Sequence, residues 1–138
     1  MDEATERRTL VGYHGTSIIS VPTLLRGVAT QAERNFPRRG QLGIGFYATN
    51  DYPMAVEFAR VAVRVVGGYR SVINVYARQF DTLIGLEVPQ ELWWNIADDS
   101  PYVTDVDYLT AAIDGYPEIR QTKFNPRAYH ALIVELPS

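Results

Sequence analysis

A histidine near the N-terminus stands in a context suited to ligand binding. His14 ends a short predicted strand and is followed at once by Gly15, Thr16 and Ser17. Because glycine has no Cβ, a ligand can reach main-chain N–H and C=O groups beside the imidazole. The alternative interpretation is a histidine that caps the turn after the strand, and the residue types alone leave both interpretations open.

A second candidate segment is rich in glycine and ends in an aromatic pair. The stretch from Gly43 to Ala48 fits the G-x-G-x-x-A pattern of dinucleotide-binding folds. In those folds the pattern opens a helix, and an acidic residue follows about 20 positions later. Here the strand-like Phe46 and Tyr47 lie within it, and residues 64–68 contain no acid. The match is therefore interpreted as accidental.

Taken in order, the two motifs resemble a known family. The segments 13–17 (YHGTS) and 42–49 (LGIGFYAT), followed by an alanine-containing helix, are similar to the ADP-ribosyltransferase fold. The nearest type is the His-Tyr-Glu branch, with its diphtheria-toxin-like and poly-ADP-ribose-polymerase-like enzymes and their small bacterial and fungal relatives. The resemblance covers residues 9–60 well and 105–136 loosely. It implies an α+β fold of two small packed β-sheets with a few peripheral helices.

The resemblance also implies an activity, with NAD as substrate, and roles for individual residues. ADP-ribose would be transferred to a protein or nucleic-acid acceptor, or NAD would be hydrolysed, and nicotinamide would be released. His14 would bond a ribose hydroxyl, with Gly15 pairing its backbone to the nicotinamide amide beside Thr16. Tyr47 would stack on the nicotinamide ring, and Phe58, eleven positions later, would complete the aromatic clamp. Aromatic walls and a fixed ribose suit a reaction through an oxocarbenium-like sugar.

The third element of the family's site, a glutamate at the start of a late strand, is not secure here. Its candidates are Gln121, which fits the register best, and Glu118. Residues three apart in a strand face opposite sides, so both cannot point into one cleft. Glutamine orients a hydroxyl but brings no charge, so turnover is expected to be slow, limited to single transfers, or absent. In the last case the chain is a degenerate domain that binds NAD, ADP-ribose or a protein.

Three other segments have weaker claims to a role. The acidic residues of 98–114 are typical of a solvated loop, and Trp93 and Trp94 of a helix with one buried face. The arginines of segment 34–39 are suited to a pyrophosphate, although a solvated loop explains them as well.

A transferase acting on the 2′-phosphate of RNA shares the His-Gly-Thr motif but needs several arginines, which disfavours it for this acidic chain.

Hydrophobic patterning predicts the elements that must position these residues. Short helices are expected at 21–26 and 89–97, and a longer one runs from about residue 50 to 66. The apolar positions of the longer helix recur at helical spacing and are expected to be its buried stripe: Met54, Phe58, Val61, Ala62 and Val65. Strands are expected at 9–14, 42–49, 71–78, 118–124 and 130–136. Because helices and strands do not alternate regularly, the pattern favours an α+β fold.

Length, charge and composition limit the classes of function. The 138 residues predict one domain over 9–138 after a polar tail at 1–8. A net charge of −3 argues against a general phosphate-backbone binder, and the absence of cysteine excludes thiolate sites. With two histidines, no metal site is expected. The N-terminus does not resemble a signal peptide, and no apolar run reaches the roughly 20 residues of a membrane span. We therefore expect a soluble protein that acts inside a cell, in the manner of a toxin-like effector.

Overall fold

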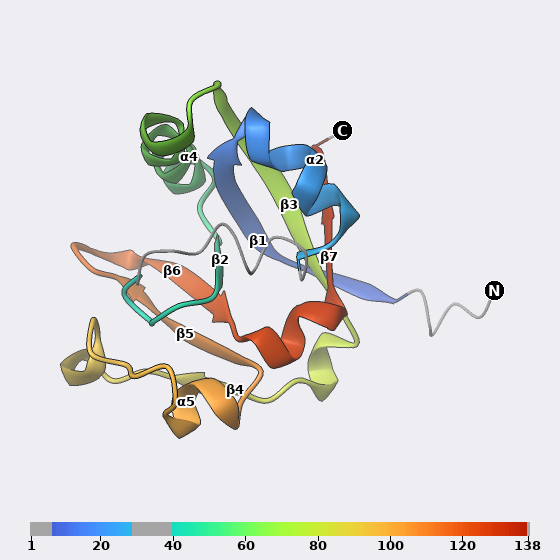
Figure 1. The fold of residues 1–138 in the computed structure, drawn as a ribbon. Helices are drawn as coiled ribbons and strands as arrows, with labels where there is room; N and C mark the ends of the chain where they lie inside the picture. Colours follow the sequence, from blue (N-terminus) through green and yellow to red (C-terminus); the bar gives the residue numbers. More distant parts are fainter. Residues whose placement is uncertain (1–6, 29–39, 138) are drawn as a thin grey trace.

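A computed structural model of the chain describes residues 7–28 and 40–137, and its centre is one seven-stranded β-sheet (Figure 1). The strand order is β4-β5-β6-β2-β1-β3-β7. Neighbours are antiparallel except β4 and β5, which are parallel. The strands are β1 (Arg8–Ser17), β2 (Phe46–Thr49), β3 (Arg70–Arg78), β4 (Gly85–Glu87), β5 (Tyr108–Ile113), β6 (Tyr116–Phe124) and β7 (Leu132–Glu135). The α+β class is confirmed.

The helices are short except for one. They are α2 (Val21–Arg26), α4 (Tyr52–Val66) and α5 (Pro101–Thr104), with 3₁₀ turns η1 (Ile18–Ser20), η2 (Phe80–Thr82), η3 (Gln90–Leu92) and η4 (Pro126–Ala131). In Figure 1, α4 and α2 lie to either side of β1 and β3, while α5 lies beyond the other end of the sheet, near β4. No helix in the described ranges is long and apolar enough to cross a membrane.

The expectation of two separate sheets is wrong, and the centre of the sheet explains why. β2 pairs with β6 on one side and with β1 on the other, so the strands form one continuous sheet. The join is nevertheless narrow, because β1 pairs with β2 at a single position, Tyr13 opposite Thr49. β1 pairs with β3 along its whole length. Beyond Tyr13, β1 and β2 therefore separate within the sheet.

Helix α4 forms where the sequence predicts it, but only the first part of the expected stripe is buried. The Asp51 side chain caps its first turn by accepting a hydrogen bond of 2.9 Å from the Met54 N–H. Its buried residues are Met54, Ala55 and Ala59, whereas Val61 and Val65 of the expected stripe are more than half exposed. Ala55 and Ala59 are fully buried because α4 lies very close to β1, where an added Cβ at Gly15 would be 1.8 Å from the Ala55 carbonyl oxygen.

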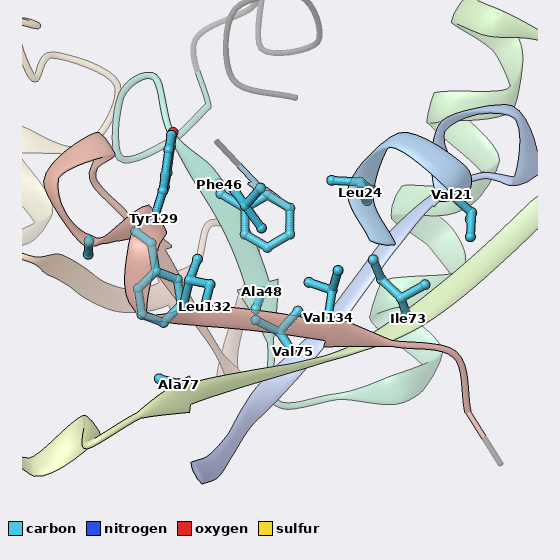
Figure 2. Packing of buried hydrophobic residues seen from close by; sticks show 13 residues of the cluster. Val21, Leu24, Phe46, Ala48, Ile73, Val75, Ala77, Tyr129, Leu132 and Val134 are labelled. Atoms are coloured by element: carbon cyan, nitrogen blue, oxygen red, sulfur yellow. The ribbon is translucent and has the colours of Figure 1, made fainter. Parts of the chain in front are cut away.

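Two hydrophobic clusters hold the two ends of the sheet. The larger cluster packs α2 against β2, β3 and β7, and Figure 2 shows Leu24 and Val21 above Ile73, Val75 and Val134. The smaller cluster joins β5 to the segment between β4 and α5. Its fully or nearly fully buried members are Leu42, Val88, Ile96, Val106, Leu109 and Ala111.

The segment between β3 and β6 is where the sequence prediction fails most. The expected helix at 89–97 is a single 3₁₀ turn, η3, followed by further turns, and strands β4 and β5 were not expected at all. The backbone of Trp94 has a φ of 71°, which a helix cannot contain. The segment packs through isolated anchors such as Val88 and Ile96 rather than through a periodic stripe, so no helical spacing marks it.

Candidate functional site

A pocket among the described residues lies where β1 and β2 separate. It has a volume of about 390 Å³, which falls within the range of small-molecule sites. Five residues predicted from the sequence line it together: His14, Gly15, Tyr47, Phe58 and Gln121. The other lining residues are Gly40, Gln41, Met54, Trp94, Ile113, Asp114 and Tyr116. The walls are mostly apolar or aromatic, so the pocket suits a flat ring.

His14 is held across the split between the strands. Its Nδ1 lies 2.6 Å from the Tyr47 carbonyl oxygen, and its ring stacks on Phe46 with 4.3 Å between the ring centroids. A carbonyl only accepts, so Nδ1 carries the proton, and the lone pair is on Nε2. Burial lowers the pKa of His14 from 6.5 to about 4, against the raising effect of the carbonyl. The imidazole is therefore neutral at physiological pH, with Nε2 as a hydrogen-bond acceptor.

Tyr47 contributes its ring to the pocket and its hydroxyl to the neighbouring turn. The hydroxyl accepts a 2.9 Å bond from the Leu42 N–H and donates to the Gly43 carbonyl. Gly40 lies against the ring, where an added Cβ would be 2.6 Å from Cζ. The turn therefore requires glycine at position 40 in order to hold the phenol. The side chain is held by strand β2 at its Cα and by the turn at its hydroxyl. Its ring is therefore a preorganised wall that loses little entropy when a ligand stacks on it.

Phe58 reaches the pocket from α4, together with Met54. Phe58 is partly buried, whereas Met54 is buried. The two residues are four apart on the helix and therefore share a face. The helix that Asp51 caps thus delivers a second aromatic wall to the site.

Of the two candidates for the third site position, Gln121 lines the pocket and Glu118 does not. Gln121 is buried, at 5% exposure, on β6 opposite Thr49 of β2. Its Nε2 donates a 2.7 Å hydrogen bond to Oε1 of Gln41. Glu118 is exposed and lies outside the lining of the pocket. Tyr116 and Gln121 both line the pocket although they are five apart, which agrees with the irregular register of β6 between Tyr116 and Arg120.

Two expectations for the N-terminal motif need correction. Thr16 is buried on β1 but does not line the pocket, because its side chain points to the face opposite Gly15. Gly15 does line the pocket, but its missing Cβ serves packing, because an added Cβ would lie 1.8 Å from the Ala55 carbonyl oxygen. The glycine is thus required for α4 to approach β1. Ser17 is structural, donating to the Gly67 carbonyl at 2.5 Å.

Sequence reasoning missed Gln41 and gave Trp94 and Asp114 too little weight. Trp94 is 56% exposed at the pocket, and its Nε1 donates a 2.8 Å bond to Asp114 Oδ2. The tandem tryptophans were the available clue, and the structure separates them, since Trp93 packs on the smaller cluster. Gln41 lies between Gly40 and the stretch from Gly43 to Ala48, and no sequence motif includes it. The arginines of segment 34–39 lie outside the described residues.

The described side chains contain no group of three or more His, Cys, Asp or Glu placed to hold a metal ion. Comparison with known proteins gives no match, either to a protein-family model or to a curated protein. What the site can do is therefore argued from its chemistry. It combines aromatic walls, a neutral histidine with a free acceptor nitrogen, and a buried glutamine. Such a pocket is suited to a flat ring joined to a group that carries hydroxyls.

Proposed function

We propose that the chain binds NAD and cleaves its nicotinamide–ribose bond, as an ADP-ribosyltransferase or an NAD hydrolase. The observation that carries the proposal is the single pocket lined by His14, Tyr47, Phe58 and Gln121, which come from four different elements. The two sequence motifs contain His14 and Tyr47, and the resemblance that they carry implies roles for Phe58 and Gln121. Their convergence supports the resemblance that suggested them.

The chemistry follows from these side chains. The nicotinamide ring stacks between the rings of Tyr47 and Phe58, and Nε2 of His14 accepts a hydrogen bond from a ribose hydroxyl. The bond between C1′ and the ring nitrogen breaks, and its electron pair leaves with neutral nicotinamide. The sugar passes through an oxocarbenium-like state and is captured at C1′ by an acceptor group or by water, which loses a proton. Holding the ring and the sugar in fixed positions lowers the entropic part of the barrier.

One observation favours a second candidate, a domain that binds NAD or ADP-ribose without cleaving it. Among the described residues that line the pocket, the one carboxylate is Asp114, which is exposed and bonded to Trp94. Position 121 carries an uncharged amide. A developing positive charge at the sugar therefore receives less electrostatic stabilisation than a buried carboxylate would give.

Release of nicotinamide separates the two candidates. The purified protein is incubated with NAD, and free nicotinamide is quantified by mass spectrometry against buffer and against the His14→Ala variant. An enzyme releases nicotinamide well above both controls. Release at the rate of the buffer blank, together with measurable NAD binding, would establish the non-catalytic candidate. A labelled-NAD transfer assay on a lysate then distinguishes a transferase from a hydrolase.

A further inference from the structure

Gln41 connects three segments around the pocket. It is 4% exposed, and its backbone carbonyl accepts a 2.8 Å bond from the Trp94 N–H. Its side-chain Nε2 donates to the Ala112 carbonyl at 2.7 Å. Its Oε1 accepts from the Asp114 N–H at 2.9 Å and from Gln121 Nε2 at 2.7 Å. Both ends of this amide are therefore engaged in a buried network.

The orientation of the Gln41 amide is determined by two backbone groups. The Ala112 carbonyl can only accept, so it requires the NH₂ end, and the Asp114 N–H can only donate, so it requires the oxygen. Turning the amide over would break both bonds and place like groups in contact. Each buried polar group left unpaired in this way costs roughly 1–3 kcal/mol. The oxygen of Gln41 therefore faces Gln121.

This orientation determines the orientation of Gln121 in turn. Because Gln41 presents an acceptor, Gln121 must present its NH₂ group to Gln41. Among the residues that the structure describes, Gln41 is the one bonded to the Gln121 side chain. The Gln121 carbonyl oxygen is left for the pocket, where Nε2 of His14 is a second acceptor.

We infer that Gln41 is a positioning residue that orients Gln121 so that the pocket selects a ligand with hydroxyl donors beside its ring. The inference rests on the proposed function and narrows its substrate class. Two acceptors, Gln121 Oε1 and His14 Nε2, pair with the hydroxyls of a ribose. An anionic group at the same place would meet acceptors on both sides. The pocket therefore binds a ring joined to a sugar whose ring hydroxyls carry no phosphate.

The same geometry explains why a glutamate does not fit at position 121. A carboxylate there would direct one oxygen at Gln41 Oε1, which is itself an acceptor. The protonated carboxyl can instead donate to that oxygen, and a hydrogen bond to the neutral form raises a pKa. Substituting Gln121→Glu alone therefore introduces a carboxyl whose charged form is disfavoured by the facing oxygen of Gln41.

This consequence gives a test that requires no NAD. The pKa of the introduced carboxyl is measured by ¹³C NMR in Gln121→Glu and in the double variant Gln121→Glu/Gln41→Met. We expect it at least about one unit above the ordinary 4.3 in the single variant, and lower by about one unit in the double variant. A pKa that stays unchanged or rises when the Gln41 amide is removed would overturn the inference.

The two variants differ in sequence only at position 41, so the comparison measures the effect of the Gln41 amide and of the backbone groups that it binds. The titratable side chains around that position are His14, Tyr47, Asp114 and Tyr116 in the pocket and Lys123 along β6. Because Gln41→Met could impair folding, a second measurement uses the unmodified protein. A scalar coupling across the hydrogen bond from Gln121 Nε2 to the Gln41 side-chain carbonyl carbon is expected. A coupling in the reverse direction would contradict the inference.

A ligand experiment then tests the substrate class. Affinities for nicotinamide riboside and for its analogue without ribose hydroxyls are compared in the unmodified protein and in Gln41→Met. We expect the unmodified protein to prefer the riboside about tenfold, and Gln41→Met to lose most of that preference. An unchanged ratio would overturn the positioning role. If neither compound binds the unmodified protein, the proposed function fails, while the two NMR measurements still decide the orientation of Gln121.

Discussion

The imidazole of His14 and the backbone of Tyr47 bridge the two strands that separate at the pocket, with 2.6 Å between Nδ1 and the carbonyl oxygen. β1 and β2 pair directly at one position only. The side chain therefore continues the connection between the strands beyond the point where their pairing ends. It also places a neutral acceptor nitrogen in the cavity that this separation creates.

The neutral state of His14 predicts a pH dependence of stability. Its pKa is lowered from 6.5 to about 4, so the unfolded chain binds more protons than the folded chain between these values. The stabilisation is complete above pH 6.5 and is lost as the pH falls toward 4. Between pH 7 and pH 4, the free energy of unfolding should fall by about 2–3 kcal/mol more in the unmodified protein than in His14→Gln. The free energy of unfolding is measured by chemical denaturation of both proteins at pH 7 and at pH 4. If it falls by the same amount in the unmodified protein and in His14→Gln, the pKa of His14 is not lowered by folding.

Gly15→Ala should destabilise the protein through helix packing. The added Cβ would lie 1.8 Å from the Ala55 carbonyl oxygen, and two backbones would have to move apart. We expect a loss of more than about 3 kcal/mol in the free energy of unfolding, measured by denaturant titration. Gly27→Ala is the control, because an added Cβ there meets nothing within 4 Å and only the positive φ adds a cost. Similar losses in the two variants would contradict the packing role of Gly15.

Phe58→Leu should weaken NAD binding without unfolding the chain. A leucine retains most of the apolar contact of this partly buried position but cannot stack on a ring. The expected loss is about 1 kcal/mol of binding free energy, or roughly fivefold in affinity. Val61→Ala, on the exposed side of the same helix, should leave the affinity unchanged. A loss of the same size in both variants would assign the effect to the helix rather than to the ring.

Trp94→Gly should lower the affinity for NAD while leaving the stability of the fold nearly unchanged. The φ of 71° at Trp94 is unfavourable for a tryptophan and suits glycine, so the substitution relieves strain while it removes the bond to Asp114. These effects are each about 1 kcal/mol and opposite in sign, so the melting temperature should change little. Affinity for NAD should nevertheless fall severalfold, because the exposed ring at the pocket is lost. An unchanged affinity would show that the strained tryptophan has no part in binding.

The parts of the fold that were predicted well depend on local rules. Helix α4 was predicted because Asp51, Pro53 and Gly67 mark its ends, and α2 because Ser20 and Gly27 do the same. Strand β3 was predicted from its high density of valine and isoleucine, and β6 as a strand that ends before Asn125 and Pro126. Strand β4 is only three residues long and could not be recognised from its pattern.

The candidate site was partly predictable for a similar reason. His14 and Tyr47 lie in motifs whose order along the chain carries information, so they could be named together. The role of Gln41 depends on the Ala112 and Asp114 backbone groups, about 70 positions away. No spacing rule connects such residues, because the polarity of a buried amide is set by tertiary contacts.

Calorimetric titration with NAD tests the central claim most directly, with the two histidines as a matched pair. His14 lines the pocket, while His130 is exposed in η4 and lies outside it. The unmodified protein and His130→Ala should bind NAD equally, and His14→Ala should bind at least about tenfold more weakly, as expected for a lost hydrogen bond and ring contact. Equal affinity in all three proteins, or no binding by the unmodified protein, would contradict the account.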